Sequence, residues 1–473
     1  MAADVAFSQH TLEWQCNCHP NERPERTLLR GRELRYNRGM NAICLVVDRL
    51  HAGYVGAYGN AWVETPALDR LASQATVFDQ ALIDSPRLES LCRSYWQGWH
   101  ALCPREPPEA RPSLAALLRE AGVTTALLTD EPRVARHPLA VDFDDLIEID
   151  PPWQPRSAVD IEQTHFARCF VQVLDWLESA PAPFMLWGHL GGLGTTWDAP
   201  LKFRQAYCEE GDPPPPLSAD VPDQFLPAGH DPDDLLGIVQ SYAGQVTLLD
   251  TCLDALLEFL DGTPAGRETL VVVTSARGFP LGEHGRVGPC DDALFGELVH
   301  VPWMMRMPSA SPLPTNLRSV PGEGLGVRAE GLGVRAAGGW PDAAGARCQA
   351  LVEPADLWAT LLDFWQIALP QSPTARSLLP LVRQEAAAPR DRLCIRSGIE
   401  RAIRTPAWYL RLGAEPELFV KPDDRWEINN VANRCGEVVE CLQDALTQYE
   451  LSLRCGRTAD LPPLSDVLLN GLE

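Results

Sequence analysis

The run Ala42–Val47, AICLVV, followed at once by Asp48, is the stretch that decides the fold. A continuous apolar run of this length is typical of a central strand in a parallel sheet, because such a strand is buried on both faces and does not alternate. Asp48 then stands at the carboxyl end of the strand, which is the edge where open α/β sheets bind ligands. This stretch predicts a parallel sheet with a functional edge beside Asp48.

Strand and helix patterns alternate along most of the remaining chain. The longest helical pattern, Asp234–Leu260, has apolar residues at steps of three and four that form one buried stripe, and the strand Thr269–Ser275 follows it. This alternation predicts an α/β fold with a large, mostly parallel sheet and helices on both faces. The other expected elements are a helix opening at Thr65-Pro66, helices at Ser113–Ala121, Ile161–Leu177 and Ala350–Trp365, and strands at Val123–Thr129, Pro183–Trp187 and Val301–Met307.

The chain changes character near Arg390. Four short strand-like pieces and a closing helix predict a small C-terminal α+β subdomain with an antiparallel sheet. We therefore expect a polar extension at 1–39, an α/β domain at 40–389 and the subdomain at 390–473. The expected pieces of this subdomain are Leu393–Ile395, Ala402–Arg404, Tyr409–Leu412, Glu417–Val420 and the helix Glu437–Leu453.

A loop insertion at 309–347 is expected inside the α/β domain. It contains the heptad EGLGVRA twice in tandem, at 323–329 and 330–336. Each copy matches the dinucleotide fingerprint G-x-G-x-x-A, but no strand precedes it and no helix follows. Nucleotide binding is therefore not expected here.

The polar extension at 1–39 has no apolar core followed by a cleavage site, so it does not read as a signal peptide. Either Met1 or Met40 serves as the true start. Cys16, Cys18 and His19 lack a second ligand pair at zinc spacing, so we expect no metal there.

Composition excludes two classes of partner. The chain has 40 Lys+Arg against 64 Asp+Glu, a formal net charge of −24, which repels nucleic acid and anionic membrane surfaces. No apolar run approaches the roughly 20 residues of a membrane span. The 14 cysteines are scattered, and Cys44, Cys169 and Cys252 lie on apolar faces, which favours buried thiols in a reducing compartment. We expect a cytoplasmic protein.

Three segments are expected to meet at the carboxyl edge of the sheet. They are Asp48-Arg49, the loop and helix Ser85–His100, and Thr274–Gly285 after the later strand. Together they bring one carboxylate, several arginines and an exposed histidine to one place.

At these residues the chain resembles the sulfatases, sulfuric ester hydrolases of the alkaline phosphatase superfamily. The resemblance implies a large α/β domain with a C-terminal sheet subdomain, a calcium or magnesium ion, and a nucleophile modified to an aldehyde hydrate. The matching segments follow the family order from about Met40 to Asn433: NAICLVVDRLHAGYVGAYGN, ETPALDRLASQATVFDQA, TLVVVTSARGFPLGEHG, FGELVHVPWMMRMP and ERAIRTPAWYLRL…ELFVKPDDRWEINNVAN.

The metal positions depart from this family pattern. Sulfatases usually end the first strand in two adjacent Asp, where this chain has Asp48 followed by Arg49. The family's Thr-Ser-Asp-His/Asn-Gly element stands here with Ala276 and Arg277 at its ligand positions. The resemblance thus leaves only Asp48 as a residual metal ligand, with Ala276 and Arg277 at lost positions.

The nucleophile position departs as well. Alignment on Gly98 places it at Leu88, or at Glu89 after a shift of one residue, and neither can become the modified nucleophile. Cys92 then stands at the family's arginine position. Ser90 and Cys92 are weak alternative nucleophiles with no base at readable spacing, and no G-x-S-x-G elbow occurs. The histidine-proline element after the middle strand retains only His189.

Electrostatics argues against a metal at this edge. Asp48, Arg49 and Arg277 together carry a net charge of +1. An arginine about 5 Å from a divalent ion is repelled by roughly 6–7 kcal/mol at an effective dielectric of about 20. We therefore expect no cofactor.

Two arrangements of the edge remain open. Guanidinium groups bind sulfate or phosphate through bidentate forks, so Arg49, Arg277, Arg93 and His284 are candidates for a metal-free oxyanion pocket. Alternatively, Asp48 pairs with Arg49 or Arg277 and fills a vacated cleft, and His284 is a turn histidine. Trp96, Trp99 and Trp187 are expected in the core.

These observations favour a catalytically inactive sulfatase-like protein that serves as a binding or scaffold protein. Its expected partner is another protein or a small ligand carrying sulfate or phosphate. The alternative is an active sulfate- or phosphate-ester hydrolase with a rebuilt site.

Overall fold

The computed structural model describes residues 40–104, 111–150, 155–291, 293–309, 344–386, 388, 390–455, 458 and 461–472. The predicted extension at 1–39, with Cys16, Cys18 and His19, lies outside the described residues. Most of the predicted insertion, including both heptad copies, also lies outside them. The start site and the domain boundaries stay predictions.

An eight-stranded sheet forms the centre of the described chain, in the order β10-β2-β9-β7-β1-β5-β3-β4. β9 runs antiparallel to both of its neighbours, and the other pairs are parallel. All seven residues of β1 are buried, as the apolar run predicts. The predicted fold class is therefore confirmed. The strands are β1 (Asn41–Val47), β2 (Thr76–Ala81), β3 (Thr124–Thr129), β4 (Asp145–Glu148), β5 (Phe184–Leu190), β7 (Thr269–Thr274), β9 (Trp303–Arg306) and β10 (Arg347–Val352).

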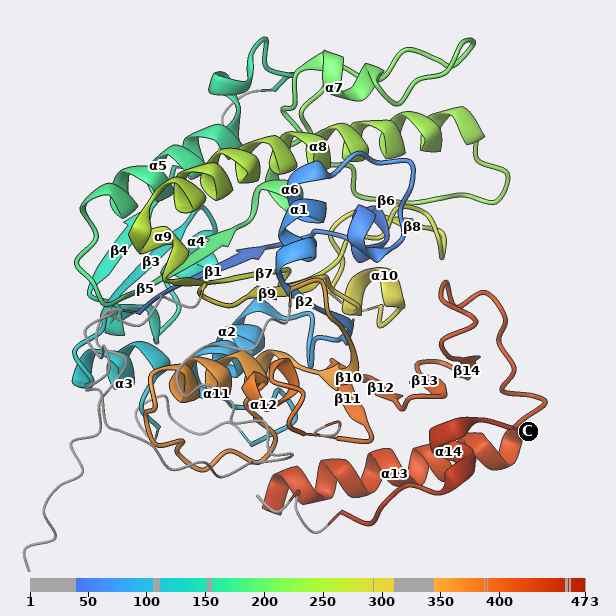
Figure 1. The fold of residues 1–473 in the computed structure, drawn as a ribbon. Coiled ribbons are helices and arrows are strands. Elements are labelled where there is room, and N and C mark those ends of the chain that lie inside the picture. Colours follow the sequence, from blue (N-terminus) through green and yellow to red (C-terminus); the bar gives the residue numbers. More distant parts are fainter. Residues whose placement is uncertain are drawn as a thin grey trace, which may run out of the picture. The chain divides into compact units, whose positions relative to one another are not determined.

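Helices cover both faces of this sheet (Figure 1). On one face, α1 (Pro66–Gln74), α5 (His165–Ser179) and α8 (Pro232–Gly262) pack against the side of β1 that carries Ile43 and Leu45. On the other, α2 (Leu88–Gln97), α3 (Leu114–Glu120) and α11 (Pro354–Phe364) pack against its Ala42 and Cys44 side. Alternate residues of one strand thus enter two cores. Trp96, Trp99 and Trp187 are buried, as predicted.

A second, antiparallel sheet of four strands follows near the C-terminus, in the order β11-β12-β13-β14. Its apolar face packs with α13 (Gly436–Cys455) around Trp408, Leu410 and Leu442. The small C-terminal antiparallel sheet is thus confirmed as well. Its strands are β11 (Leu393–Ser397), β12 (Glu400–Arg404), β13 (Trp408–Leu412) and β14 (Pro416–Val420).

Short elements connect these layers. None of the helices in the described ranges is both long and apolar enough to cross a membrane. The short elements are the helices η1 (Ala52–Tyr54), η2 (Gly56–Tyr58), α4 (Pro132–Ala135), η4 (Ala140–Asp142), η5 (Ile161–Gln163), α6 (Gly192–Thr195), α7 (Leu201–Gln205), α9 (Pro264–Arg267), α10 (Gly296–Val299), α12 (Leu379–Val382) and α14 (Asp466–Asn470), and the strand pair β6 (Gln224–Phe225) and β8 (Arg286–Val287).

Candidate functional site

A tight turn after β1 places Asp48 and Arg49 at the carboxyl edge of the sheet. Arg49 has φ +68°, in the left-handed region that non-glycine residues rarely adopt. Two hydrogen bonds hold this turn, because the Tyr242 hydroxyl donates to Arg49 O at 2.7 Å and Leu50 N donates to Ser275 Oγ at 3.2 Å. The second bond ties the end of β1 to the residue that follows β7, so Asp48 and Arg277 lie close together.

Arg277 binds Asp48 through a buried, two-pronged ion pair. Its Nε donates to Asp48 Oδ1 at 3.0 Å, and its Nη2 donates to Asp48 Oδ2. Both side chains are almost fully buried. Of the two pairings that the sequence left open for Asp48, the structure contains the one with Arg277.

Asp291 is a site residue that the sequence analysis missed. It accepts hydrogen bonds at 2.8 Å from both Arg277 Nη1 and Arg49 Nη2. Arg49 Nη1 also donates to Cys290 O at 2.9 Å. The expected net charge of +1 was therefore wrong for the assembled edge, because the four side chains sum to zero once Asp291 is included.

A divalent cation at this edge would need several oxygen ligands that are free to coordinate. Both carboxylate oxygens of Asp48 already accept from Arg277. Ala276 is fully buried and offers no ligand atom. Burial alone would raise the pKa of Asp48, but the charge and hydrogen bonds of Arg277 outweigh it and hold that pKa well below its usual value. Asp48 is thus ionised, with a guanidinium as its positive partner.

The start of α2 reaches this edge, since Arg277 Nη1 also donates to Pro86 O at 3.3 Å. Leu88, at the expected nucleophile position, is buried in the core, while Glu89 is exposed. Ser90 is partly exposed on α2. Cys92 is buried, and burial raises the pKa of its thiol far above the ordinary value. A thiol held neutral in this way is a poor nucleophile.

The other oxyanion candidates are not gathered around Arg277. His284 Nδ1 lies 2.8 Å from Glu297 Oε1, its Nε2 lies 3.2 Å from Glu427 O, and its ring stacks on Phe295. Arg93 is partly exposed on α2, where its charge acts on His137. The structure therefore brings together Arg49 and Arg277 of the four candidates.

His189 lies on β5 beside this group. It is buried, and its Nε2 has no hydrogen-bond partner among the described residues. Burial lowers the pKa of His189, with the charge of Asp48 acting in the opposite direction. A neutral imidazole next to the Asp48–Arg277 pair is the result.

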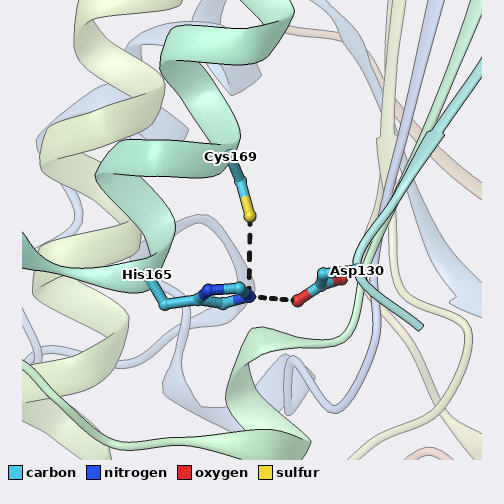
Figure 2. A group of neighbouring side chains, drawn as sticks. All are labelled: Asp130, His165 and Cys169. Carbon is cyan, nitrogen blue, oxygen red and sulfur yellow. Dashed lines mark hydrogen bonds and ion pairs between the residues drawn. The ribbon is translucent and has the colours of Figure 1, made fainter. Parts of the chain in front are cut away.

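A second polar group, Asp130, His165 and Cys169, lies near the carboxyl end of β3 (Figure 2). His165 and Cys169 stand one turn apart on α5. The His165 ring points toward Asp130, whose Oδ2 lies 2.6 Å from His165 Nε2, and Cys169 Sγ points toward the same Nε2 at 3.7 Å. These three residue types suit a transition metal. However, Arg168 donates to His165 Nδ1 at 3.1 Å, so Nε2 carries the proton that faces Asp130. As it stands, the group is a hydrogen-bonded network in which both ring nitrogens of His165 already have partners.

Two signals in the sequence could have revealed this second group. Asp130 directly follows a strand, as Asp48 does, and a spacing of four residues places His165 and Cys169 on one helix face.

The chain is similar to known sulfatases in sequence. Residues 40–364 match the family model described as Sulfatase. Iduronate 2-sulfatase of Homo sapiens is 23% identical over 337 residues, which cover 57% of this chain and 60% of that protein. The chain thus matches less than two thirds of that relative's length.

Solved structures share the fold at lower identity. The phosphonate monoester hydrolase of Agrobacterium radiobacter has a TM-score of 0.66 and 17% identity, covering 88% of this chain and 95% of that one. The phosphonate monoester hydrolase from Silicibacter pomeroyi has a TM-score of 0.63 and 17% identity, with 92% and 100% covered. A structure described as a 2-O GAG sulfatase has a TM-score of 0.64 and 19% identity, with 88% and 92% covered.

Proposed function

This chain belongs to the sulfatase family, and from that premise we propose that it is a catalytically silent member that acts as a binding or scaffold protein. The observation that supports the proposal is the buried ion pair between Arg277 and Asp48. Sulfatases usually bind calcium or magnesium, and here a guanidinium neutralises the one retained ligand.

The proposal includes the loss of the metal. A cation at Asp48 must break two hydrogen bonds of Arg277 and lie beside the guanidinium that it displaces. Removing one partner of a buried ion pair is strongly unfavourable, because the other charge stays buried without compensation. This donor set does not fit calcium or magnesium, and we propose that neither binds.

An oxyanion pocket at Arg49 and Arg277 is the secondary form of the proposal. Binding of sulfate or phosphate there requires displacement of Asp291, which occupies both guanidinium groups. The side chain of Asp291 is 40% exposed, so it is the member of the group that can move into solvent.

Two further parts of the proposal concern cellular context. The 12 cysteines among the described residues form no disulfide with one another, and most are buried. This supports a reducing compartment, and we propose the cytoplasm. The net charge of −24 supports a protein or small-ligand partner rather than nucleic acid or a membrane surface.

Turnover of 4-nitrophenyl sulfate and 4-nitrophenyl phosphate, with and without calcium or magnesium, tests the proposal. We expect the wild-type rate to equal that of an Asp48→Ala variant under every condition. Elemental analysis of the purified protein should find no stoichiometric calcium or magnesium. Metal-stimulated turnover that Asp48→Ala abolishes would establish the alternative, an active hydrolase with a rebuilt site.

A further inference from the structure

A cavity of about 230 Å³ lies between the β2 and β10 edge of the large sheet and the C-terminal sheet. Asp79, Gln80 and Arg347 line it from the large sheet, and Arg404 and the loop 421–427 line it from the other side. None of Asp48, Arg49, Arg277 or Asp291 lines it. Although His51, Ala52 and Gly53 line it just after the turn at Arg49, the cavity does not include the four side chains of that group, and the inference does not depend on the proposed function.

Positively charged groups outnumber carboxylates around this cavity. Its lining has four Lys or Arg side chains and three carboxylates, although the whole chain carries −24. Arg347 pairs with Asp79, Lys421 pairs with Glu427, and Glu297 pairs with His284. The remaining two cations, Arg404 and Arg425, have no carboxylate partner among the described residues.

Arg404 is the more buried of these two cations, since it is only 6% exposed, which is uncommon for an arginine without a carboxylate partner. Its Nη2 donates to Gln80 Oε1 at 2.7 Å, and its Nη1 donates to the carbonyl oxygens of Thr405, Pro406 and Trp408. All of these acceptors are neutral. Burial lowers the pKa of Arg404 to about 10, so the guanidinium stays charged at neutral pH. The charge of Glu427 acts on Arg404, but no ion pair or hydrogen bond joins the two side chains. A buried charge with no carboxylate in contact is costly, and an anion in the cavity would offset that cost.

Arg425 lies nearer the surface. Its Nη1 donates to Tyr58 O at 2.7 Å, and its guanidinium lies over the ring of Trp426. This single hydrogen bond leaves other guanidinium donors available to a ligand.

The pKa of His300, which lines the cavity, is sensitive to the positive charges around it. Its Nε2 lies 2.9 Å from Asp79 O. Burial, and then the charges of Arg425, Lys421 and Arg404, lower the pKa of His300 to about 3. Three cations thus act together on one point of the lining.

The cavity also has apolar walls. Leu82, Val299, Tyr409 and Trp426 line it, and Trp426 is 42% exposed. We propose that this cavity binds a small organic phosphate monoester, with the phosphate facing Arg404 and Arg425 and the organic group against the apolar wall. Two unpaired guanidinium groups match a group that carries a charge of about −1.5 to −2 at neutral pH. A sulfate monoester carries a single charge and should bind more weakly.

Isothermal titration calorimetry on the full chain tests this proposal, with 4-nitrophenyl phosphate, 4-nitrophenyl sulfate, inorganic phosphate and 4-nitrophenol as probes. We expect the organic phosphate to bind about tenfold more tightly than the organic sulfate or inorganic phosphate. The uncharged phenol should show no binding. Equal affinity for phosphate and sulfate, or no binding of the organic phosphate, would overturn the proposal.

Single substitutions test whether the organic phosphate binds in this cavity. Arg425→Ala removes an exposed side chain with one hydrogen bond, so the fold should survive while affinity for the organic phosphate falls at least about tenfold. The matched control is Arg119→Ala, which removes a half-exposed arginine of α3. Asp291→Asn removes the carboxylate that pairs with Arg49 and Arg277 and changes no residue of the cavity lining. Affinity that rises in Asp291→Asn, or that is unchanged in Arg425→Ala, would place the ligand elsewhere and refute the inference.

Discussion

Arg277 donates hydrogen bonds to both carboxylate oxygens of Asp48, a residue 229 positions earlier in the chain. The pair joins the end of β1 to the loop after β7, and Asp291 joins it to Arg49. In this arrangement the guanidinium of Arg277 is the positive charge that faces Asp48, at a place where the family usually has a metal ion.

Asp48→Ala should destabilise the protein by about 3–5 kcal/mol, because it leaves Arg277 buried with only Asp291 as a charged partner. Urea unfolding followed by circular dichroism measures this free energy. The double variant Asp48→Leu with Arg277→Met removes both charges. Its loss in the free energy of unfolding should be clearly smaller than that of Asp48→Ala. If the double variant is as unstable as the single one, packing rather than charge maintains this edge.

Low pH should remove the contribution of Asp48 to the stability of the fold. Burial and Arg277 act in opposite directions on its pKa, and Arg277 prevails, so the folded-state pKa lies below the unfolded value of about 4. A carboxylate with a lowered pKa stabilises the fold above its unfolded pKa, and that stability is lost as pH falls toward the folded pKa. The stability difference between wild type and Asp48→Asn should therefore narrow from about pH 7 to about pH 2. A difference that is constant over this range would contradict an ionised Asp48.

Restoring carboxylates should restore a metal response. The triple variant Arg49→Asp, Ala276→Asp and Arg277→Asn replaces both arginines and adds two carboxylates around Asp48. Calcium should raise its thermal midpoint and, at about 100 times the dissociation constant, stabilise it by about 2.7 kcal/mol. Wild type and the single variant Ala276→Asp should not respond. A calcium-dependent rise of equal size in wild type would refute the proposed loss of the metal.

The sequence predicted the fold well because its signals are local. The apolar run of β1, the stripe of α8 and the short strands after Arg390 each have a periodicity that can be read without knowing their neighbours. The carboxyl-edge rule also placed Asp48 and Arg277 together, as the structure has them.

The partners of these residues were harder to predict. The sequence left Asp48 with two candidate arginines, because the choice depends on the left-handed turn at Arg49, which sends that side chain toward Asp291 instead. Asp291 itself lies in a segment between β8 and α10 with no helical or strand periodicity. Its carboxylate changes the net charge of the edge from +1 to zero. The charge expected from the sequence was therefore wrong because of one loop residue that the sequence did not connect with this edge.

Cys92 should resist alkylation in the folded protein. Burial raises the pKa of its thiol, whereas Cys441 and Cys455 are exposed on α13. Treatment with iodoacetamide at about pH 8, followed by mass spectrometry of peptides, should label the two exposed cysteines and leave Cys92 unmodified until denaturant is added. Labelling of Cys92 before Cys441 would show that the Cys92 thiol is activated and would support Cys92 as a nucleophile.

His284 should stabilise the protein more in mild acid than in alkali. Burial lowers its pKa, but the hydrogen bond and charge of Glu297 outweigh burial, so the folded-state pKa lies above the usual value. A histidine with a raised pKa contributes stability that is fully present below its unfolded pKa of about 6.5 and is lost as pH rises through the folded pKa. The destabilisation caused by His284→Gln should therefore be larger at about pH 5.5 than at about pH 9. An equal loss in His284→Gln at both pH values would mean that stacking on Phe295, rather than the charge pair with Glu297, accounts for its contribution.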